Sequence, residues 1–111
     1  MCLTRRAPAP HRAVAEYRVS LRAREDLLNI YAESESTFGP YQADAYHAGL
    51  ERTFGLLADF PRIGINADEL VPSYRRFRFQ SHYIFFTAEV EHVLIRALIH
   101  VRQNLRPALF Q

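Results

Sequence analysis

The spacing of apolar residues changes along the chain, and this change limits the possible folds more than any other feature. Within residues 23–34 and again within residues 43–58, apolar side chains recur every three or four positions, which is the pattern of an amphipathic helix. Residues 17–21, 77–79 and 93–101 instead alternate between two faces, as strands do. The chain therefore combines a helical part with a sheet whose strands lie on both sides of it in the sequence.

Gly and Pro mark where these segments end. Gly39 and Pro40 separate the two helical stretches, and Pro61 ends the second one. Residues 65–73 have no period and are predicted to be a loop, whereas residues 83–88 form an apolar run dense in aromatic residues, typical of a strand. We predict an α+β fold in which a helical hairpin packs on a mainly antiparallel four-stranded sheet, in the order βααβββ.

Short polar pairs are expected to connect the last three strands. Ser81-His82 and Glu91-His92 both stand between apolar runs and are predicted to be tight turns. In the last strand, regular alternation places two sets of side chains on opposite faces: Val93, Ile95, Ala97, Ile99 and Val101 on one, and Leu94, Arg96, Leu98 and His100 on the other.

The length and composition favour one domain. Residues 16–111 carry all the periodic segments, while residues 1–15 contain two prolines and no pattern and are predicted to be a flexible N-terminal extension. The single Cys2 permits no internal disulfide and, alone, no zinc site, so we expect no metal and no cofactor. No signal peptide and no apolar run of about 18 residues is present, which favours a cytoplasmic protein without a membrane partner.

Every basic residue of the chain is arginine. There are 14 Lys plus Arg residues, and none of them is Lys, which excludes Schiff-base chemistry, a phosphate-binding loop lysine and a lysine general base. Arginine stays protonated and binds anions without moving protons. The charge is uneven: residues 16–69 hold five Arg and ten acids, whereas residues 70–111 hold six Arg and two acids. The strands therefore carry a basic surface and the helices an acidic one.

Four groups of residues, in this order, resemble the RelE/ParE superfamily of bacterial toxins, and most closely its ParE branch. They are Ser20-x-x-Ala23-x-x-Asp26-Leu27-x-x-Ile30, Leu57-x-x-x-Pro61-x-x-Gly64, Arg75-Arg76 followed by Tyr83-Ile84-Phe85-Phe86, and His100-x-Arg102-x-Asn104. The resemblance covers about residues 16 to 110. It implies the toxin of a type II toxin–antitoxin system, which inhibits DNA gyrase by binding.

Two positions depart from the family pattern. The family often has Tyr where Phe86 stands, and it often has Arg where Ala97 stands, whereas here the nearest basic residue is Arg96. A shift of one residue along a regular strand moves a side chain to the opposite face. We therefore expect Arg96 to point away from the side that the family's Arg occupies.

The resemblance leaves an enzymatic alternative open. RelE-like relatives are ribosome-dependent mRNA endoribonucleases, which need a base, an acid and cations around the phosphate. In this chain Arg78, Arg96 and His100 are the candidates for such a set. A further alternative is a non-toxic relative that only binds its antitoxin.

The binding function implies a set of contact residues and partners. An acidic, amphipathic C-terminal segment of a ParD-like antitoxin would suit a surface rich in arginine, because guanidinium groups bind carboxylates in a bidentate manner. Operator DNA would be contacted only indirectly, through the antitoxin. The predicted partner-binding residues are Arg75, Arg76, Arg78, Arg96, Arg102, Arg106, Leu109 and Phe110.

Overall fold

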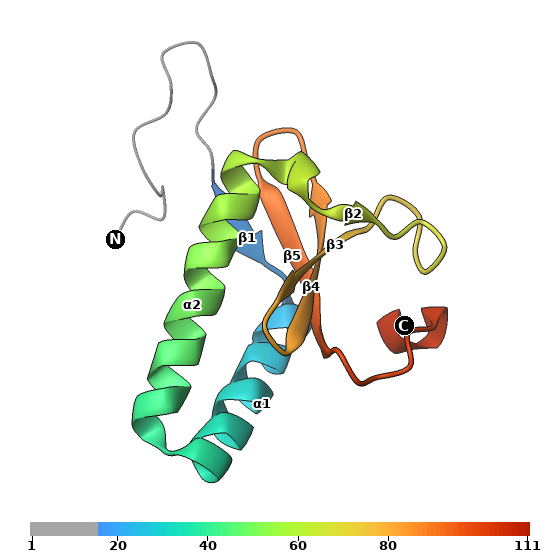
Figure 1. Ribbon diagram of the computed structural model, residues 1–111. Helices are drawn as coiled ribbons and strands as arrows, with labels where there is room; N and C mark the ends of the chain where they lie inside the picture. Colours follow the sequence, from blue (N-terminus) through green and yellow to red (C-terminus); the bar gives the residue numbers. More distant parts are fainter. Residues whose placement is uncertain (1–15) are drawn as a thin grey trace.

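The computed structural model describes residues 16–111; the predicted N-terminal extension, residues 1–15, lies outside the described part. The elements follow in the order β1 (Tyr17–Val19), α1 (Leu21–Phe38), α2 (Pro40–Asp59), η1 (Pro61–Ile63), β2 (Ile65–Asn66), β3 (Arg75–Phe79), β4 (His82–Ala88), β5 (Val93–His100) and η2 (Pro107–Phe110). The predicted α+β class is confirmed. Figure 1 shows the helical hairpin lying along one side of the sheet.

The sheet has five strands in the order β1-β5-β4-β3-β2. β1 runs parallel to β5, and the other neighbouring pairs are antiparallel. The sequence predicted four strands. The fifth is β2, whose two residues pair with Arg76 and Arg75 at the edge of the sheet. Two residues are too few to show an alternating pattern, which is why they were predicted to be loop.

The helical hairpin forms where the Gly and Pro residues of the sequence predict its ends. Ser20 caps α1 by accepting a hydrogen bond from the amide of Ala23, 3.1 Å away. Gly39 ends α1 with φ of +93°, a backbone conformation that disfavours side chains, and Pro40 opens α2 at the position where a missing amide costs nothing.

The main core lies between the hairpin and one face of the sheet, which we call the helix face. Its buried residues are Ala23, Ile30, Leu50, Phe54, Leu57, Ile84, Phe86, Val93, Ile95 and Leu98. Leu50, Phe54 and Leu57, three apolar residues of the second predicted helix, are in this set, and Tyr46 packs against it.

The opposite face of the sheet, which we call the second face, carries a smaller core. Phe85, Ala97 and Ile99 are buried there beneath Ala67, and partly buried residues of the 67–74 segment and the C-terminus pack against them. In Figure 1 the C-terminal η2 lies on the side of the sheet away from the helices. The hairpin therefore covers one face of the sheet, and two short segments pack on the other.

Three details of the predicted strands are wrong. The first strand ends at Val19 rather than Leu21, because Ser20 caps α1 and Leu21 is its first residue. His82 is the first residue of β4 rather than part of the turn, which consists of Gln80 and Ser81. Gln80 adopts a positive φ of 49°, so the reversal is complete one residue earlier than expected. The last strand ends at His100 rather than Val101.

Candidate functional site

The last strand contains a β-bulge at Arg96, and the bulge decides which arginine faces which side. Phe85 pairs with Ala97, but the next residue, Phe86, pairs with Ile95, so Arg96 has no partner in β4. Ile95 belongs to the helix-face core and Ala97 to the second-face core. The predicted regular alternation of β5 is therefore wrong. In residues 93–95 the odd-numbered side chains face the helices, whereas in residues 97–100 the even-numbered ones do.

The bulge also overturns the expectation for Arg96. Arg96 and Ala97 lie on the same face, because the extra residue cancels the shift that a regular strand would impose. Contacts with Thr87 and Tyr74, described below, place the Arg96 side chain on the second face. The Arg96 side chain thus lies on the same face as Ala97, the position at which the family often has Arg.

Residues at the start of α1 hold the bulge. The Ser20 hydroxyl donates to the carbonyl of Arg96 at 3.1 Å, and the Ser20 amide donates to the carbonyl of Ile95 at 2.9 Å. The Asp26 carboxylate accepts a hydrogen bond from the amide of Leu98 at 3.0 Å. These contacts satisfy backbone groups of β5 beyond Val19, where its parallel partner β1 ends. They also give a physical reason for Ser20 and Asp26 in the first motif.

On the second face, the Arg96 guanidinium is held by three neighbours. Its Nε donates to the Thr87 hydroxyl at 3.2 Å, and an Nη lies 3.6 Å from a Glu89 oxygen. Its central carbon also stands 5.5 Å from the centre of the Tyr74 ring. The side chain remains about one third exposed, so it is oriented while part of it still faces solvent.

The three arginines of β3 divide between the two faces. Arg76 and Arg78 lie opposite Phe85 and Tyr83, which places both on the second face. The Arg76 guanidinium stacks over the Tyr83 ring at 5.1 Å, and Arg78, which is exposed, donates to the Gln80 carbonyl at 2.7 Å. The second face therefore presents Arg76, Arg78 and Arg96.

Arg75 points to the other face and has a structural role. It lies opposite Phe86, and its Nη2 donates to the carbonyls of Gly64 at 2.5 Å and Arg62 at 3.2 Å. The guanidinium thereby ties β3 to the turn after α2. Gly64 is required there, because a Cβ would stand 2.7 Å from the Phe86 ring and 2.9 Å from the Arg76 carbonyl. This explains the glycine of the second motif.

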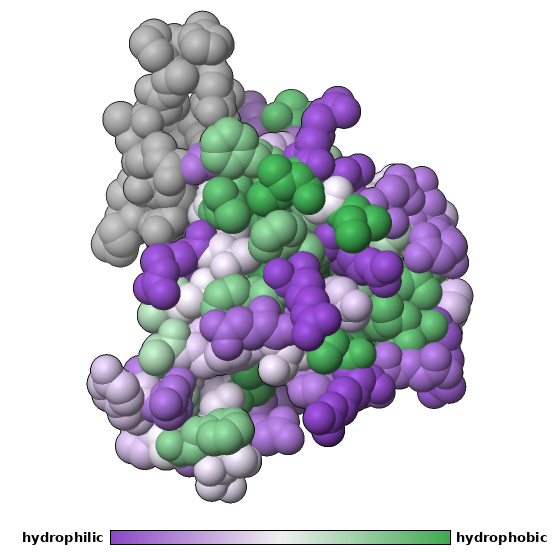
Figure 2. All heavy atoms as spheres, in the orientation of Figure 1, coloured by the Kyte–Doolittle hydropathy of each residue, from purple (hydrophilic) through white to green (hydrophobic). Residues whose placement is uncertain are grey.

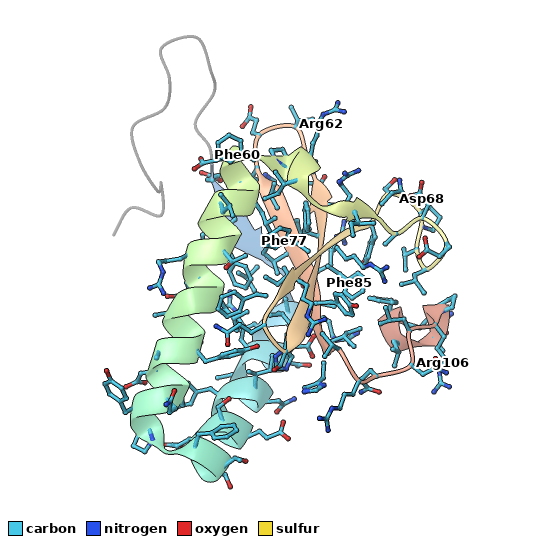
Figure 3. The ribbon with its side chains drawn as sticks, in the orientation of Figure 1. Phe60, Arg62, Asp68, Phe77, Phe85 and Arg106 are labelled. Carbon is cyan, nitrogen blue, oxygen red and sulfur yellow. The ribbon has the colours of Figure 1, made fainter. Side chains whose placement is uncertain are left out.

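The C-terminal segment packs onto the second face. The Phe110 ring contacts Phe85 with centroids 4.8 Å apart and Tyr74 with centroids 5.7 Å apart. The Leu109 carbonyl accepts a hydrogen bond from Nη1 of Arg22 at 2.8 Å, and Arg22 is itself paired with Asp26. Figure 3 shows Phe85 pointing toward η2. Leu109 and Phe110 are therefore partly buried in the domain, next to the arginines of the second face.

Arg102 and Arg106 are exposed and lie beyond the strands. The Arg102 amide donates to Nδ1 of His100 at 3.1 Å, and the Arg106 carbonyl accepts from the Leu109 amide at 3.0 Å. No side-chain partner in the described residues holds either guanidinium, so both are available at the margin of the domain. Figure 3 shows Arg106 beside η2.

His100 lies on the helix face, in an open groove of about 600 Å³ between the hairpin and the β3–β4 turn. Its ring contacts His82, with centroids 5.1 Å apart, and Nδ1 of His82 lies 2.8 Å from the Tyr46 hydroxyl. Burial, and to a lesser extent the adjacent His100, lowers the pKa of His82 from 6.5 to about 4. His82 is therefore neutral at neutral pH.

The structure does not bring the three candidate nuclease residues together. Arg78 and Arg96 lie on the second face, whereas His100 lies in the groove on the helix face. No arginine lines this groove, and its one charged lining residue is Glu33. A phosphate bound in this groove would meet no arginine among the lining residues, and a phosphate bound at Arg96 would lie on the opposite face of the sheet from His100.

Within residues 16–111, no three side chains of His, Cys, Asp or Glu lie close enough together to hold a metal ion. None of the helices there is long and apolar enough to cross a membrane.

Four residues that shape the second face were not among the predicted contact residues. Tyr74 and Tyr83 place aromatic rings under Arg96 and Arg76, and Arg22 with Asp26 connects α1 to the C-terminal segment. The spacing of Arg22 and Asp26, four residues apart on a helix, is a signal for an ion pair. Nothing in the sequence indicates that this pair also contacts Leu98 and Leu109, more than 70 residues away.

Comparison with known proteins gives a consistent result. Residues 17–105 match the family described as the ParE toxin of the type II toxin-antitoxin system, parDE. The chain is 37% identical over 93 residues to a protein named Toxin ParE1 from Caulobacter vibrioides, covering 84% of this chain and 96% of the relative. A Toxin ParE1 from Mycobacterium tuberculosis is 28% identical over 92 residues, covering 82% of this chain and 94% of the relative.

A solved structure shares the fold. It is described as a chromosomal ParDE TA system from P. aeruginosa, and it superposes with a TM-score of 0.68 at 18% identity. The match covers 78% of this chain and 95% of that chain. At this identity the likeness is evidence for the fold.

Proposed function

Since this chain belongs to the ParE family of type II toxins, we propose that it inhibits DNA gyrase by binding and that a cognate antitoxin neutralises it. Gyrase inhibition stops replication by trapping the enzyme on cleaved DNA, and it needs contact residues rather than an acid and a base. The antitoxin would be ParD-like, with an acidic amphipathic C-terminal segment, and would link the toxin to operator DNA. Because both proposed partners are cytoplasmic, the proposal includes a cytoplasmic location.

The observation that carries this proposal over a nuclease is the separation of Arg78 and Arg96 from His100. The two arginines share the second face with Phe110, whereas His100 lies across the sheet. A surface of oriented guanidinium groups beside apolar side chains suits binding of a protein. It does not combine a base, an acid and a cation at one phosphate.

The proposed contact surface is the second face with its margin: Arg76, Arg78 and Arg96 from the strands, Arg102 and Arg106 beyond them, and Leu109 and Phe110. Arg75 was also predicted to bind a partner. Its guanidinium donates to two backbone carbonyls, so it supports the turn after α2 and has less freedom to bind another protein.

The test in cells is inducible expression with and without the adjacent antitoxin gene. We expect filamentation and a DNA-damage response while protein synthesis continues, and recovery when the antitoxin is co-expressed. Arrest of translation before any DNA damage would support the nuclease alternative. Harmless over-expression of a folded protein that still binds the antitoxin would identify a non-toxic relative.

A matched pair of variants tests the surface. Arg96→Gln keeps a donor for Thr87 but removes the charge, and Arg24→Gln removes the charge of an exposed arginine on α1. Losing a charged contact costs about 1.5–3 kcal/mol. We therefore expect Arg96→Gln to weaken gyrase inhibition by about 10- to 100-fold, with Arg24→Gln close to the unchanged protein. Equal activity of the two variants would refute a role for Arg96.

A further inference from the structure

The second face ends at the β3–β4 turn, and three arginines gather there. Arg76 and Arg78 lie two residues apart on the same side of β3. Arg102 follows the end of β5, which a backbone hydrogen bond of 2.9 Å joins to the turn. We call these arginines, together with Tyr83 opposite Arg78, the turn-end patch. Figure 1 shows the β3–β4 turn beside the chain that leaves β5, and Figure 2 shows hydrophilic side chains over both.

The acidic side chains of the second face lie at the other end of the strands. Residues 70–88 and 92–111 contain no Asp or Glu. Glu89 follows the far end of β4, and Asp68 and Glu69 precede the far end of β3. Figure 3 shows Asp68 away from the β3–β4 turn. The turn-end patch is therefore positively charged where it faces solvent.

Two further acids lie on the helix side of the sheet. Glu33 lines the groove that contains His100, and Asp26 already pairs with Arg22 at 3.0 Å. Neither forms an ion pair with the turn-end patch within residues 16–111. A ligand on the second face would meet the arginines directly and these acids only across the sheet. The patch therefore suits an anionic ligand.

Tyr83 gives the turn-end patch an aromatic surface. The Arg76 guanidinium stands 5.1 Å from the centre of the Tyr83 ring, and both side chains are partly exposed. Nucleic-acid bases stack on aromatic rings and on guanidinium planes. Arg78 uses only Nε for the Gln80 carbonyl, so its two terminal nitrogens can bind a phosphate in a bidentate manner. The patch thus offers a stacking surface beside phosphate donors.

A protein partner fits the turn-end patch less well than a nucleic acid. Within residues 75–83 and 100–104, no large apolar side chain is among the exposed ones. The exposed neighbours are uncharged and polar: Gln80, Ser81, Gln103 and Asn104. Protein interfaces place aromatic or apolar anchors at their centre. On the second face such anchors, Leu109 and Phe110, belong to the C-terminal segment, so the face divides into two parts.

These features point to one occupant. We propose that the turn-end patch binds single-stranded DNA without regard to sequence, with phosphates on Arg78 and Arg102 and a base stacked on Arg76 and Tyr83. That this strand belongs to the cleaved DNA in gyrase rests on the proposed function, whereas the binding itself does not. The toxin would then hold the enzyme through the C-terminal segment and the DNA through the turn-end patch. The strand stays intact, because His100 lies on the other face.

The experiment measures fluorescence anisotropy of a labelled DNA strand of about 15 nucleotides with the purified toxin, at several salt concentrations. We expect a Kd of about 1–100 μM near physiological salt. Each phosphate contact to a single strand contributes about 0.7 to the slope of log K against log salt. Arg102→Gln should therefore reduce the slope by about 0.7, whereas Arg24→Gln, at an exposed arginine of α1, should leave it unchanged.

Tyr83 provides a second readout, because stacking adds affinity without adding a phosphate contact. Tyr83→Leu should weaken binding by about tenfold with little change in the salt slope. Tyr83→Phe keeps the ring and should bind nearly as tightly as the unchanged protein. Thermal unfolding of each variant confirms that it folds.

The outcomes distinguish DNA binding from gyrase inhibition. If the toxin inhibits gyrase but binds no strand at low salt, or if Arg102→Gln and Arg24→Gln give equal slopes, DNA binding by the patch is wrong and the proposed function stands. Polyglutamate bound as tightly as the DNA strand would show a protein-binding surface instead. RNA of the same sequence bound far more tightly would favour the nuclease alternative over both proposals. Strand binding with the expected slopes, but no effect on gyrase, would retain the DNA site and refute the gyrase assignment.

Discussion

Removing the Asp26 carboxylate should destabilise the protein through the bulge in β5. The carboxylate accepts from the amide of Leu98 at 3.0 Å, and Leu98 is only 5% exposed. In Asp26→Ala this amide loses its acceptor in a largely buried site, at a cost of about 1–3 kcal/mol. The pairing with Arg22 adds about 0.5 kcal/mol, because the arginine is partly exposed. We expect a total loss of about 1.5–3.5 kcal/mol.

Asp26→Asn is the matched control, because its amide oxygen can still accept from Leu98 while the charge is gone. We expect it to lose only about 1 kcal/mol. Urea unfolding followed by circular dichroism gives both values, and exchange of the Leu98 amide reports the local effect. The reasoning would be refuted by a loss below about 1 kcal/mol for Asp26→Ala, or by equal losses for the two variants.

Three other changes test separate parts of the structure. Gly64→Ala should cost about 2–4 kcal/mol, because the new Cβ would stand 2.7 Å from the Phe86 ring; urea unfolding measures it. The fold favours the neutral form of His82, so the free energy of unfolding should fall as the pH drops from about 6.5 to about 4. We expect a loss of about 1–2 kcal/mol, because His82 is only partly buried. Unfolding at several pH values measures this loss. Phe110→Ala should cost about 1–2 kcal/mol by removing its ring contact with Phe85, as thermal unfolding would show.

Each of these has its own control. Gly39→Ala meets open space, so it carries only the strain of its positive φ and should cost less than Gly64→Ala. His82→Gln should remove most of the acid sensitivity, and a profile unchanged by this substitution would contradict the assignment. Phe110→Leu should recover part of the loss. Equal stability of Phe110→Ala and the unchanged protein would mean that the C-terminal segment does not pack as described.

The hairpin and the fold class were predictable because the apolar residues of α1 and α2 recur at one period over many turns. Leu50, Phe54 and Leu57 lie in the core as expected. Gly39 and Pro61 predicted the end of α1 and the end of α2 to within two residues. Long periodic segments carry enough positions to separate a helix from a strand.

The arrangement of the second face was not predictable to the same degree. β5 is apolar at nearly every position, so its sequence shows no sign that the alternation changes phase at Arg96. The bulge depends on hydrogen bonds from Ser20 and Asp26, which come from a distant segment. The stacking partners of Arg76 and Arg96 are likewise set by the tertiary fold. The basic character of the surface was predictable, whereas its geometry was not.

We propose above all that this toxin acts on DNA gyrase by binding. The most direct measurement is a supercoiling and cleavage assay with purified gyrase, the purified toxin and, in a second series, its antitoxin. We predict that the toxin blocks supercoiling and accumulates cleaved DNA, that the antitoxin prevents both, and that His100→Ala retains the effect. Undisturbed supercoiling at a large excess of folded toxin, together with ribosome-dependent cleavage of mRNA, would contradict the account.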